Sequence, residues 1–414
     1  MKKRVVVTGM GTINPLGNSV EEFWNNIKAN KSGIGLNTRF DTTDYESKIT
    51  GEVKNFNPSD HMDSKAARKM GLFTQYAAAS ANEAMKMAGL EAGNFDAERA
   101  GTIVGNGIGG FEVLESSFEK LFSEGPKRIP PMTIPKLIAN ECPGNIAIMH
   151  GLKGPCYTVT TACASGTDAI GNALFMIQNG MSDIVVTGGT ESSLTKLGIG
   201  GFCRLMTLST GYNDAPEKAS RPFDRDRDGF VIAEGAGILV LEEYEHAKKR
   251  GANILAELAG YGLSCDAYHL TSPHSEGLGA IQAIKLALQS AGMKPEEIDY
   301  VNAHGTSTPT NDPIETKAIK AVFGDHAYKF KVSSTKGMTG HLIGGAGGIE
   351  AIISIMAIRD GFFPATLNLE NPAPECDLDY VPQVGVPGTI NTAMSNSLGF
   401  GGHNGVVIFK KFSE

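Results

Sequence analysis

Three residues far apart in the sequence could together carry out nucleophilic catalysis, and the first of them is Cys163. It stands between a run of aromatic and β-branched residues at 157–161 and an apolar helical pattern at 169–178. This arrangement predicts a buried strand, a tight turn and a helix, with the thiol near the positive end of the helix dipole, where a thiolate is favoured. Small neighbours at 162 and 164–166 leave room for a substrate. Most free cysteines are simply small buried residues, so a catalytic interpretation depends on partners elsewhere in the chain.

Two histidines supply such partners. His304 follows a short strand pattern that begins at Tyr300, and hydroxyl residues come after it. His341 follows Lys336 on a glycine-rich turn that leads into a helix. A single histidine is more often a surface or core residue than a catalyst. Two histidines at strand-end turns of an α/β protein, where ligands normally bind, favour a catalytic site.

Two further glycine-rich segments could approach a ligand through backbone N–H groups. Residues 399–404 read Gly-Phe-Gly-Gly-His-Asn and precede a strand pattern at 405–409, so a tight turn would also explain them. Residues 105–110 read Gly-Asn-Gly-Ile-Gly-Gly and match the dinucleotide-binding pattern. No strand ending in Asp or Glu follows about twenty residues later, as binding of the ribose requires. A dinucleotide-dependent oxidoreductase is therefore a disfavoured alternative.

The segments that carry these residues predict an α/β fold. Strand patterns occur at residues 4–8, 101–104, 183–187 and 237–242, and helical patterns at 20–29 and 65–87, with a loop expected at 9–17. Strands that alternate with helices predict mostly parallel sheets covered by helices.

The second part of the chain repeats the first. Residues 84–90 and the following strand-turn at 102–107 are echoed by residues 287–293 and 300–305. The segment before Cys163 (Thr-Val-Thr-Thr) is echoed by the segment before Lys336 (Lys-Val-Ser-Ser), and each leads into a Gly/Ala-rich helix. Two echoes in the same order indicate duplication. They predict an N-terminal half at residues 1–252 with the cysteine and a C-terminal half at residues 253–414 with both histidines.

Composition excludes several classes of protein. The chain has 414 residues, 41% of them hydrophobic, and a net charge of −8, which argues against a nucleic-acid or membrane-surface binder. No apolar run is long enough for a membrane span, and the segment before Gly9 is too short for a signal peptide, so we expect a cytoplasmic protein. The six cysteines form no CxxC pair, which predicts neither a disulfide scaffold nor a zinc site.

Four motifs resemble those of the β-ketoacyl-acyl carrier protein synthases, condensing enzymes of the thiolase fold. They are residues 161–165, 302–308, 336–341 and 399–404. The Cys-His-His order is most similar to the type II elongation enzymes of bacterial fatty-acid synthesis. Initiating synthases have Cys-His-Asn and thiolases Cys-His-Cys, so His341 is the discriminating residue. The resemblance implies duplicated βαβαβ halves in an α/β/α/β/α layered architecture, and a homodimer.

The resemblance also implies the chemistry. Cys163 takes an acyl group from acyl carrier protein, and malonyl carrier protein then loses CO₂ and attacks the resulting thioester in a Claisen condensation. His304 and His341 hydrogen-bond the enolate oxygen. The backbone N–H groups of Cys163 and Phe400 stabilise the tetrahedral oxyanion, and Phe400 also acts as a gate. No metal or cofactor is implied beyond the phosphopantetheine that the carrier protein brings.

Other positions take supporting roles by the same resemblance. Lys336 pairs with Glu350, and Thr306 and Thr308 hydrogen-bond the phosphopantetheine arm. The acyl pocket is lined by Ile108 and Phe202. Residues 131–135 read Pro-Met-Thr-Ile-Pro where the family usually has two phenylalanines, which leaves the preferred chain length open.

An acidic carrier protein needs a local basic patch on this acidic chain. Lys65, Arg68 and Lys69 have the i, i+3, i+4 spacing of one helical face and match the docking patch of the family, which Lys127 and Arg128 would extend. Two related alternatives stay open. A polyketide-type ketosynthase has the same mechanism, and a chain-length factor has the same fold but lacks the nucleophile.

Overall fold

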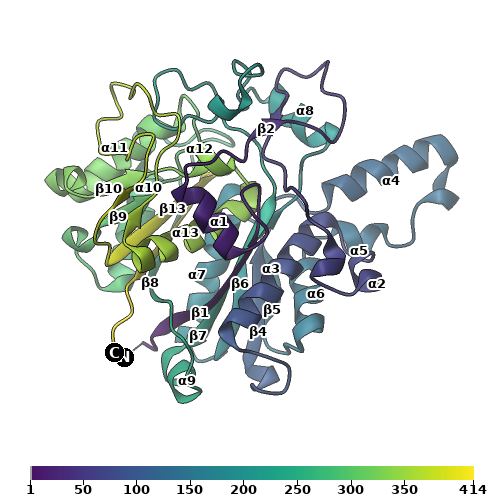
Figure 1. The fold of residues 1–414 in the computed structure, drawn as a ribbon, viewed down its shortest axis with the longest axis horizontal. Coiled ribbons are helices and arrows are strands. Elements are labelled where there is room, and N and C mark those ends of the chain that lie inside the picture. Colours follow the sequence, from purple (N-terminus) through teal and green to yellow (C-terminus); the bar gives the residue numbers. More distant parts are fainter. Residues whose placement is uncertain (1) are drawn as a thin grey trace.

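The structure, a computed structural model, describes residues 2–414. Its strands form one ten-stranded sheet in the order β10-β9-β13-β14-β8-β1-β7-β6-β4-β5 (Figure 1). The strands from the first part of the chain are β1 (Val5–Ile13), β4 (Ala100–Gly105), β5 (Cys156–Val159), β6 (Ile184–Glu191) and β7 (Gly235–Glu243). Those from the second part are β8 (Ala256–Cys265), β9 (Tyr300–Asn302), β10 (Lys331–Ser333), β13 (Thr392–Gly399) and β14 (His403–Lys410).

The sheet consists of two five-stranded halves with the same topology. In the first half β5, β4 and β6 are parallel, and β7 and β1 continue antiparallel. In the second half β10, β9 and β13 are parallel, and β14 and β8 continue antiparallel. The halves meet where β1 pairs with β8 through Val6 and Val7 only. The prediction of a duplicated fold is therefore confirmed.

Helices complete five layers. Helices α7 (Ser165–Gln178) and α13 (Ala346–Asp360) contact each other and strands of both halves, so they form the middle layer. Helices α3 (Leu72–Ala88) and α6 (Glu141–His150) cover the outer face of the first half. Helix α10 (Leu278–Ala291) covers that of the second, with α11 (Asn311–Phe323) packed against it. Nearly every residue of α13 is buried, as expected for a helix that is apolar all round. The α/β/α/β/α architecture is confirmed.

Smaller elements connect these layers. The remaining helices are α1 (Val20–Lys28), α2 (Ser64–Ala67), α4 (Phe111–Glu124), α5 (Thr133–Leu137), α8 (Lys196–Arg204), α9 (Tyr244–Lys249) and α12 (Lys336–Thr339). The short strands are β2 (Gly35–Leu36), β3 (Ile49–Thr50), β11 (Phe362–Phe363) and β12 (Val386–Pro387). Helix α1 begins where predicted, because the Ser19 side chain accepts the N–H of Glu22 as an N-cap. Among residues 2–414, no helix is long and apolar enough to cross a membrane.

Two predicted elements differ in extent. The loop expected at 9–17 is wrong in its first part, because β1 continues to Ile13. A side chain on Gly9 or Gly11 would lie 2.0 Å from a carbonyl oxygen of α3, so these glycines allow the helix to approach the strand. The helix expected at 65–87 is broken between Arg68 and Gly71 into α2 and α3. A Cβ at Gly71 would lie 2.5 Å from the carbonyl of Lys136, so the chain turns there against α5.

The strand before Cys163 is not buried as predicted. β5 lies at the edge of the sheet and pairs with β4 alone. Cys156 is exposed and the other side chains of β5 are half-buried. Aromatic and β-branched residues favour a strand in either position, so the pattern identified the strand but not its place in the sheet.

Candidate active site

Cys163 lies in a short 3₁₀ turn, Ala162–Ala164, that joins β5 to α7. Ala162 has a φ of 51°, a left-handed conformation that is strained for a residue with a side chain. The turn directs the thiol of Cys163 into a cavity and leaves only 8% of the residue exposed. The strand–turn–helix expected from the sequence is therefore present, with the cysteine just before the N-terminus of α7.

The two histidines reach the same cavity from the second half of the fold. His304 follows β9, and its backbone N–H donates to the buried carboxylate of Glu315 at 2.8 Å. His341 follows α12, and its backbone N–H donates to the carbonyl of Val231 at 2.7 Å. Its own carbonyl accepts the N–H of Ala233 at 2.9 Å. Both residues are almost fully buried, and these hydrogen bonds fix the position of their backbone.

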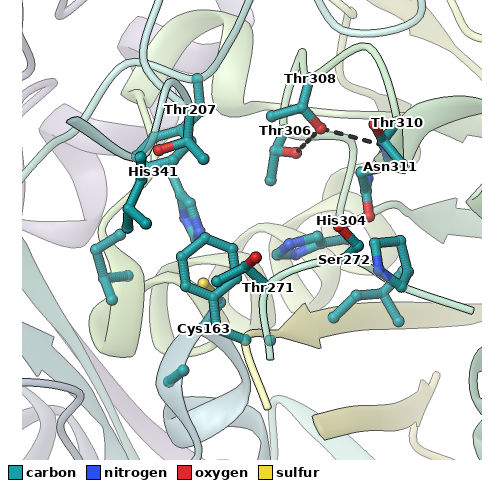
Figure 2. Close-up of a pocket in the computed structure, with 18 of the residues that line it drawn as sticks. Cys163, Thr207, Thr271, Ser272, His304, Thr306, Thr308, Thr310, Asn311 and His341 are labelled. Atoms are coloured by element: carbon teal, nitrogen blue, oxygen red, sulfur yellow. Dashed lines mark hydrogen bonds between the residues drawn. The ribbon is translucent and has the colours of Figure 1, made fainter. Parts of the chain in front are cut away.

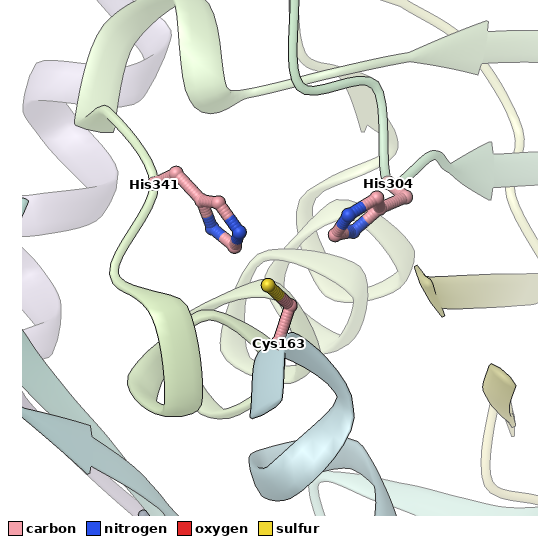
Figure 3. Close-up of side chains that lie close together, drawn as sticks. All are labelled: Cys163, His304 and His341. Atoms are coloured by element: carbon pink, nitrogen blue, oxygen red, sulfur yellow. The ribbon is translucent and has the colours of Figure 1, made fainter. Parts of the chain in front are cut away.

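The three side chains point toward one another (Figure 3). The sulfur of Cys163 and a ring nitrogen from each histidine all lie within 4.8 Å of one another. The ring centroids of His304 and His341 are 5.4 Å apart, and the planes are nearly perpendicular at 86°. Neither ring nitrogen of His341 has a hydrogen-bond partner, and Nδ1 of His304 has none. Buried polar atoms normally have partners, so these nitrogens are available to a bound substrate.

Burial determines the protonation of all three groups. It raises the pKa of the Cys163 thiol to about 12, although the charge of Lys336 and the backbone N–H groups of Phe400 and Cys163 act to lower it. Burial also lowers the pKa of His304 and His341 well below the ordinary value of 6.5, and the nearby Lys336 lowers both further. The expectation of a resting thiolate is therefore wrong. The site holds a thiol and two neutral imidazoles at neutral pH.

Lys336 does not line the cavity, but it contacts the backbone of His304. Its ammonium group pairs with the carboxylate of Glu350 and donates to the carbonyl of His304 at 2.7 Å. Both side chains are 1% exposed. Burial raises the pKa of Glu350 to about 7, against the opposing effect of Lys336. The ion pair orders the backbone of His304 and places a positive charge near the thiol.

The cavity has a volume of about 410 Å³ and two chemically different ends. Beside Cys163 its walls are apolar, formed by Ile108, Phe202, Phe230 and Ile343. Its mouth carries hydroxyl and amide groups, shown in Figure 2; these are Thr207, Thr271, Ser272, Thr306, Thr308, Thr310 and Asn311. The cavity thus joins a pocket for a hydrocarbon chain to a channel suited to a polar arm.

Sequence reasoning identified only part of this lining. Ile108, Phe202, Thr306 and Thr308 line the cavity as placed, whereas Thr271 and Ser272 were missed. They lie in the loop between β8 and α10, which carries none of the motifs. Its only signal was a Thr-Ser-Pro turn sequence.

Phe400 lies in the hairpin turn between β13 and β14 and lines the cavity. The preceding Gly399 packs on the Cys163 turn, where a Cβ would lie 2.7 Å from the carbonyl of Thr161. Gly401 and Gly402 follow with φ values of 86° and 75°. This close packing brings the Phe400 N–H to the sulfur of Cys163.

The glycines at 105–110 pack against protein rather than forming an open cradle for a dinucleotide. A Cβ at Gly105 would lie 2.2 Å from the backbone of Ser165 in α7. The N–H of Gly107 donates to the carboxylate of Glu191 at 2.9 Å, an acidic partner where a phosphate would have to lie. The dinucleotide alternative therefore has no site here.

The basic residues Lys65, Arg68 and Lys69 are all exposed. Because α2 ends at Ala67, they belong to a single helical turn and the bend after it, and not to the long helix that was predicted. Lys127 and Arg128 are also exposed, in the segment after α4.

Comparison with known proteins agrees with this geometry. The model of the β-ketoacyl synthase N-terminal domain matches residues 2–247, and that of the C-terminal domain matches residues 255–370. Proteins named 3-oxoacyl-[acyl-carrier-protein] synthase 2 are similar over the full length. The one from Synechocystis sp. is 50% identical over 411 residues, and the one from Coxiella burnetii 49% over 410, each covering 99% of both chains.

A solved structure has a similar fold and a lower sequence identity than these relatives. It contains a type II PKS acyl-carrier protein in complex with its ketosynthase. It superposes on this chain with a TM-score of 0.92 and 35% identity, over 100% of both chains. With both family domains matched and relatives 50% identical along the whole chain, the protein belongs to the β-ketoacyl synthase family.

Proposed function

We propose that this protein is a 3-oxoacyl-[acyl-carrier-protein] synthase of fatty-acid elongation, which lengthens an acyl chain by condensation with a malonyl group. The observation that carries the proposal is the cluster of one thiol and two imidazoles at the junction of an apolar pocket and a polar channel. The thiol can hold an acyl chain in the pocket, and the imidazoles can bind the second substrate.

In the first step the sulfur of Cys163 attacks the thioester carbonyl of acyl carrier protein. Because the resting group is a thiol, its proton must leave during attack; a neutral imidazole takes it and returns it to the departing phosphopantetheine thiolate. The backbone N–H groups of Cys163 and Phe400 stabilise the tetrahedral oxyanion, and such a donor contributes roughly 3–4 kcal/mol. The acyl group then lies on Cys163, with its chain between Ile108 and Phe202.

In the second step malonyl carrier protein enters by the polar channel, where Thr306 and Thr308 hydrogen-bond its arm. Loss of CO₂ leaves an enolate, whose oxygen accepts hydrogen bonds from His304 and His341, since a neutral imidazole has one N–H donor. The enolate carbon attacks the acyl carbonyl on Cys163. Collapse of the tetrahedral intermediate releases the 3-oxoacyl carrier protein and leaves Cys163 as a thiolate, which takes one proton from solvent to restore the thiol. Phosphopantetheine, carried by the substrate, is the one prosthetic group that this mechanism uses.

Two observations favour this reaction over its alternatives. The relatives named for it are about 50% identical, against 35% for the polyketide ketosynthase. A non-catalytic chain-length factor would need no nucleophile, whereas Cys163 is present with both histidines beside it. All six cysteines are free, which fits our proposal of a cytoplasmic enzyme.

The test uses purified protein with acyl and malonyl carrier proteins. We expect intact-mass spectra to show the acyl group on the enzyme when acyl carrier protein is added alone, and a 3-oxoacyl carrier protein longer by two carbons once malonyl carrier protein follows. An unmodified, folded enzyme across short and long acyl groups would refute the proposal.

We propose that the carrier protein docks on the exposed cations Lys65, Arg68 and Lys69. Reversing one charge with Arg68→Glu should raise KM for acyl carrier protein about tenfold at low salt and leave kcat within about twofold, because docking precedes chemistry. Added salt should shrink the difference by screening. Lys285→Glu, at an exposed position of α10, is the control; an equal rise in KM there would indicate net charge rather than a docking patch.

We also propose a homodimer formed on the side of β5. The strand is an unpaired edge with α6 packed beside it, and α4 projects from the body of the molecule (Figure 1). Apolar side chains exposed along this side include Phe122 at 82%, Ile134 at 60% and Ile148 at 81%. An exposed edge strand with an apolar surface normally pairs with another chain.

Phe122→Asp should therefore convert a dimer into a monomer in light-scattering measurements at micromolar concentration. Loss of one buried aromatic anchor costs about 2 kcal/mol or more, which weakens association at least about thirtyfold. Leu36→Asp, at an exposed apolar residue of β2, should leave the dimer intact. A monomeric parent protein, or a variant that remains dimeric, would contradict this interface.

A further inference from the structure

Glu191 is a fully buried carboxylate behind the apolar wall of the cavity. It is the last residue of β6, and its side chain does not line the cavity itself. One oxygen, Oε2, accepts the N–H of Gly107 at 2.9 Å and the N–H of Gly344 at 3.2 Å. These donors come from different halves of the fold, since Gly107 follows β4 and Gly344 precedes α13. The carboxylate therefore joins the two halves beside the reacting sulfur.

Each of these glycines adjoins an isoleucine of the acyl pocket. Ile108 follows Gly107, and Ile343 precedes Gly344; both isoleucines line the cavity. The two segments are in close contact, because a Cβ at Gly344 would lie 2.4 Å from the nitrogen of Gly107. A Cβ at Gly107 would lie 2.7 Å from Oε2 of Glu191. The position of both pocket walls thus depends on the same carboxylate oxygen.

Asn106 anchors the first of these segments from another direction. Its amide nitrogen donates to the carbonyl of Thr190 at 2.9 Å and lies 3.4 Å from Oε1 of Glu191. Its amide oxygen accepts the N–H of Gly109 at 2.6 Å. Ile108 is therefore held on both sides, by Glu191 through Gly107 and by Asn106 through Gly109.

Glu191 has no cationic partner in the part of the chain that the structure describes. Its donors are backbone N–H groups and the Asn106 amide, and burial raises its pKa to about 8. Its charge also acts to raise the pKa of Cys163. A buried carboxylate without a cationic partner is costly to the fold, and an apolar side chain would fill the same space more cheaply.

We infer that Glu191 is a positioning residue that holds Ile108 and Ile343 at the wall of the acyl pocket and thereby limits the acyl chain that Cys163 accepts. This inference rests on the proposed function. A short acyl group ends before the wall, whereas a long one must displace it. The bonds from Glu191 to Gly107 and Gly344 resist that displacement.

Glu191→Gln tests the inference. The amide has the same shape but only one oxygen, whereas Glu191 accepts the N–H groups of Gly107 and Gly344 at Oε2 and faces the Asn106 amide at Oε1. In either orientation the glutamine turns an NH₂ group toward one of these sets of donors, so at least one bond is lost. We expect the ratio of acylation rates for dodecanoyl over butyryl carrier protein to rise about fivefold, the factor for one net hydrogen bond. Intact mass against time measures both rates. Asn106→Ser releases the other anchor of Ile108, so it should change the ratio in the same direction.

Glu83→Gln is the matched control. Glu83 also accepts two backbone N–H groups, from Thr12 and Val20, but it lies away from the cavity. In Glu83→Gln the ratio of acylation rates for dodecanoyl over butyryl carrier protein should equal that of the parent protein. Equal loss of both rates in Glu191→Gln, or a ratio within twofold of the parent in both Glu191→Gln and Asn106→Ser, would overturn the inference. If the glutamine variant does not fold, Asn106→Ser decides alone. Absence of acylation in the parent would instead refute the proposed function.

Discussion

Cys163→Ala is expected to lose acyl transfer completely and to lower the rate of condensation by on the order of 10⁴-fold or more. Among the described residues, Cys163 supplies the thiol in the cavity that lies close to both imidazoles. The fold should remain, because alanine fits the space among the small neighbours of the turn. Intact mass after incubation with acyl carrier protein measures the first loss, and release of 3-oxoacyl product measures the second.

Cys203→Ala is the matched control for this variant. Cys203 is buried in the same apolar cluster as Cys163 but does not line the cavity. It should take up the acyl group at the rate of the parent protein. An acyl adduct that persists in Cys163→Ala and disappears in Cys203→Ala would show that Cys203, and not Cys163, is the nucleophile. An adduct in neither parent nor variants would return the non-catalytic alternative to first place.

The convergence of Cys163, His304 and His341 could be predicted because Cys163 and His304 follow strands and His341 lies in the segment after β10. Parallel strands that pair, such as β4 with β5 and β9 with β10, carry their following turns at one edge of the sheet. The duplication then brings the two edges together through α7 and α13. The turn at Ala162–Ala164 and the turn at Ile343–Gly345 occupy equivalent places before these helices, and both begin with a positive φ.

The second half differs from the first by an added segment between strand and helix. In the first half β5 leads through the Cys163 turn directly into α7. In the second half α12 intervenes between β10 and α13, and the segment carries both Lys336 and His341. The sequence echo located this segment, since it aligns the strand before Cys163 with the strand before Lys336. Lys336 and His341 therefore lie where the repeat is interrupted, whereas His304 follows β9.

Three properties could not be predicted because they depend on the folded chain: on burial, on the order of the strands and on contacts between the two halves. The thiolate expected at Cys163 follows from the helix dipole alone, whereas desolvation of the thiol is the larger effect. The edge position of β5 depends on strand order, which periodicity does not contain. Glu191 has no motif around it, and its role appears only when Gly107 and Gly344 from opposite halves meet at one oxygen.

The second large effect is expected for the histidines. His341→Ala and His304→Ala should each lower the rate of condensation about 100- to 1000-fold, the usual cost of removing one donor from a developing oxyanion. Acyl transfer to Cys163 should fall less, because the backbone N–H groups of Cys163 and Phe400 stabilise that transition state and the remaining imidazole, also close to the sulfur, can still take the thiol proton. Intact mass measures acyl transfer, and CO₂ release from malonyl carrier protein measures the enolate step.

Two further variants separate a donor role from a structural one. His341→Asn keeps a side-chain N–H group, so it should recover part of the condensation that alanine loses. His150→Ala removes a half-buried histidine, in α6, whose pKa is likewise lowered by burial and whose Nε2 has no partner. It should leave both steps unchanged. If His341→Ala slowed acyl transfer and CO₂ release by the same factor, the ring would act by shaping the cavity, and the enolate would need another donor. If the imidazoles serve mainly as donors to the enolate, His341→Ala should slow CO₂ release and condensation far more than acyl transfer.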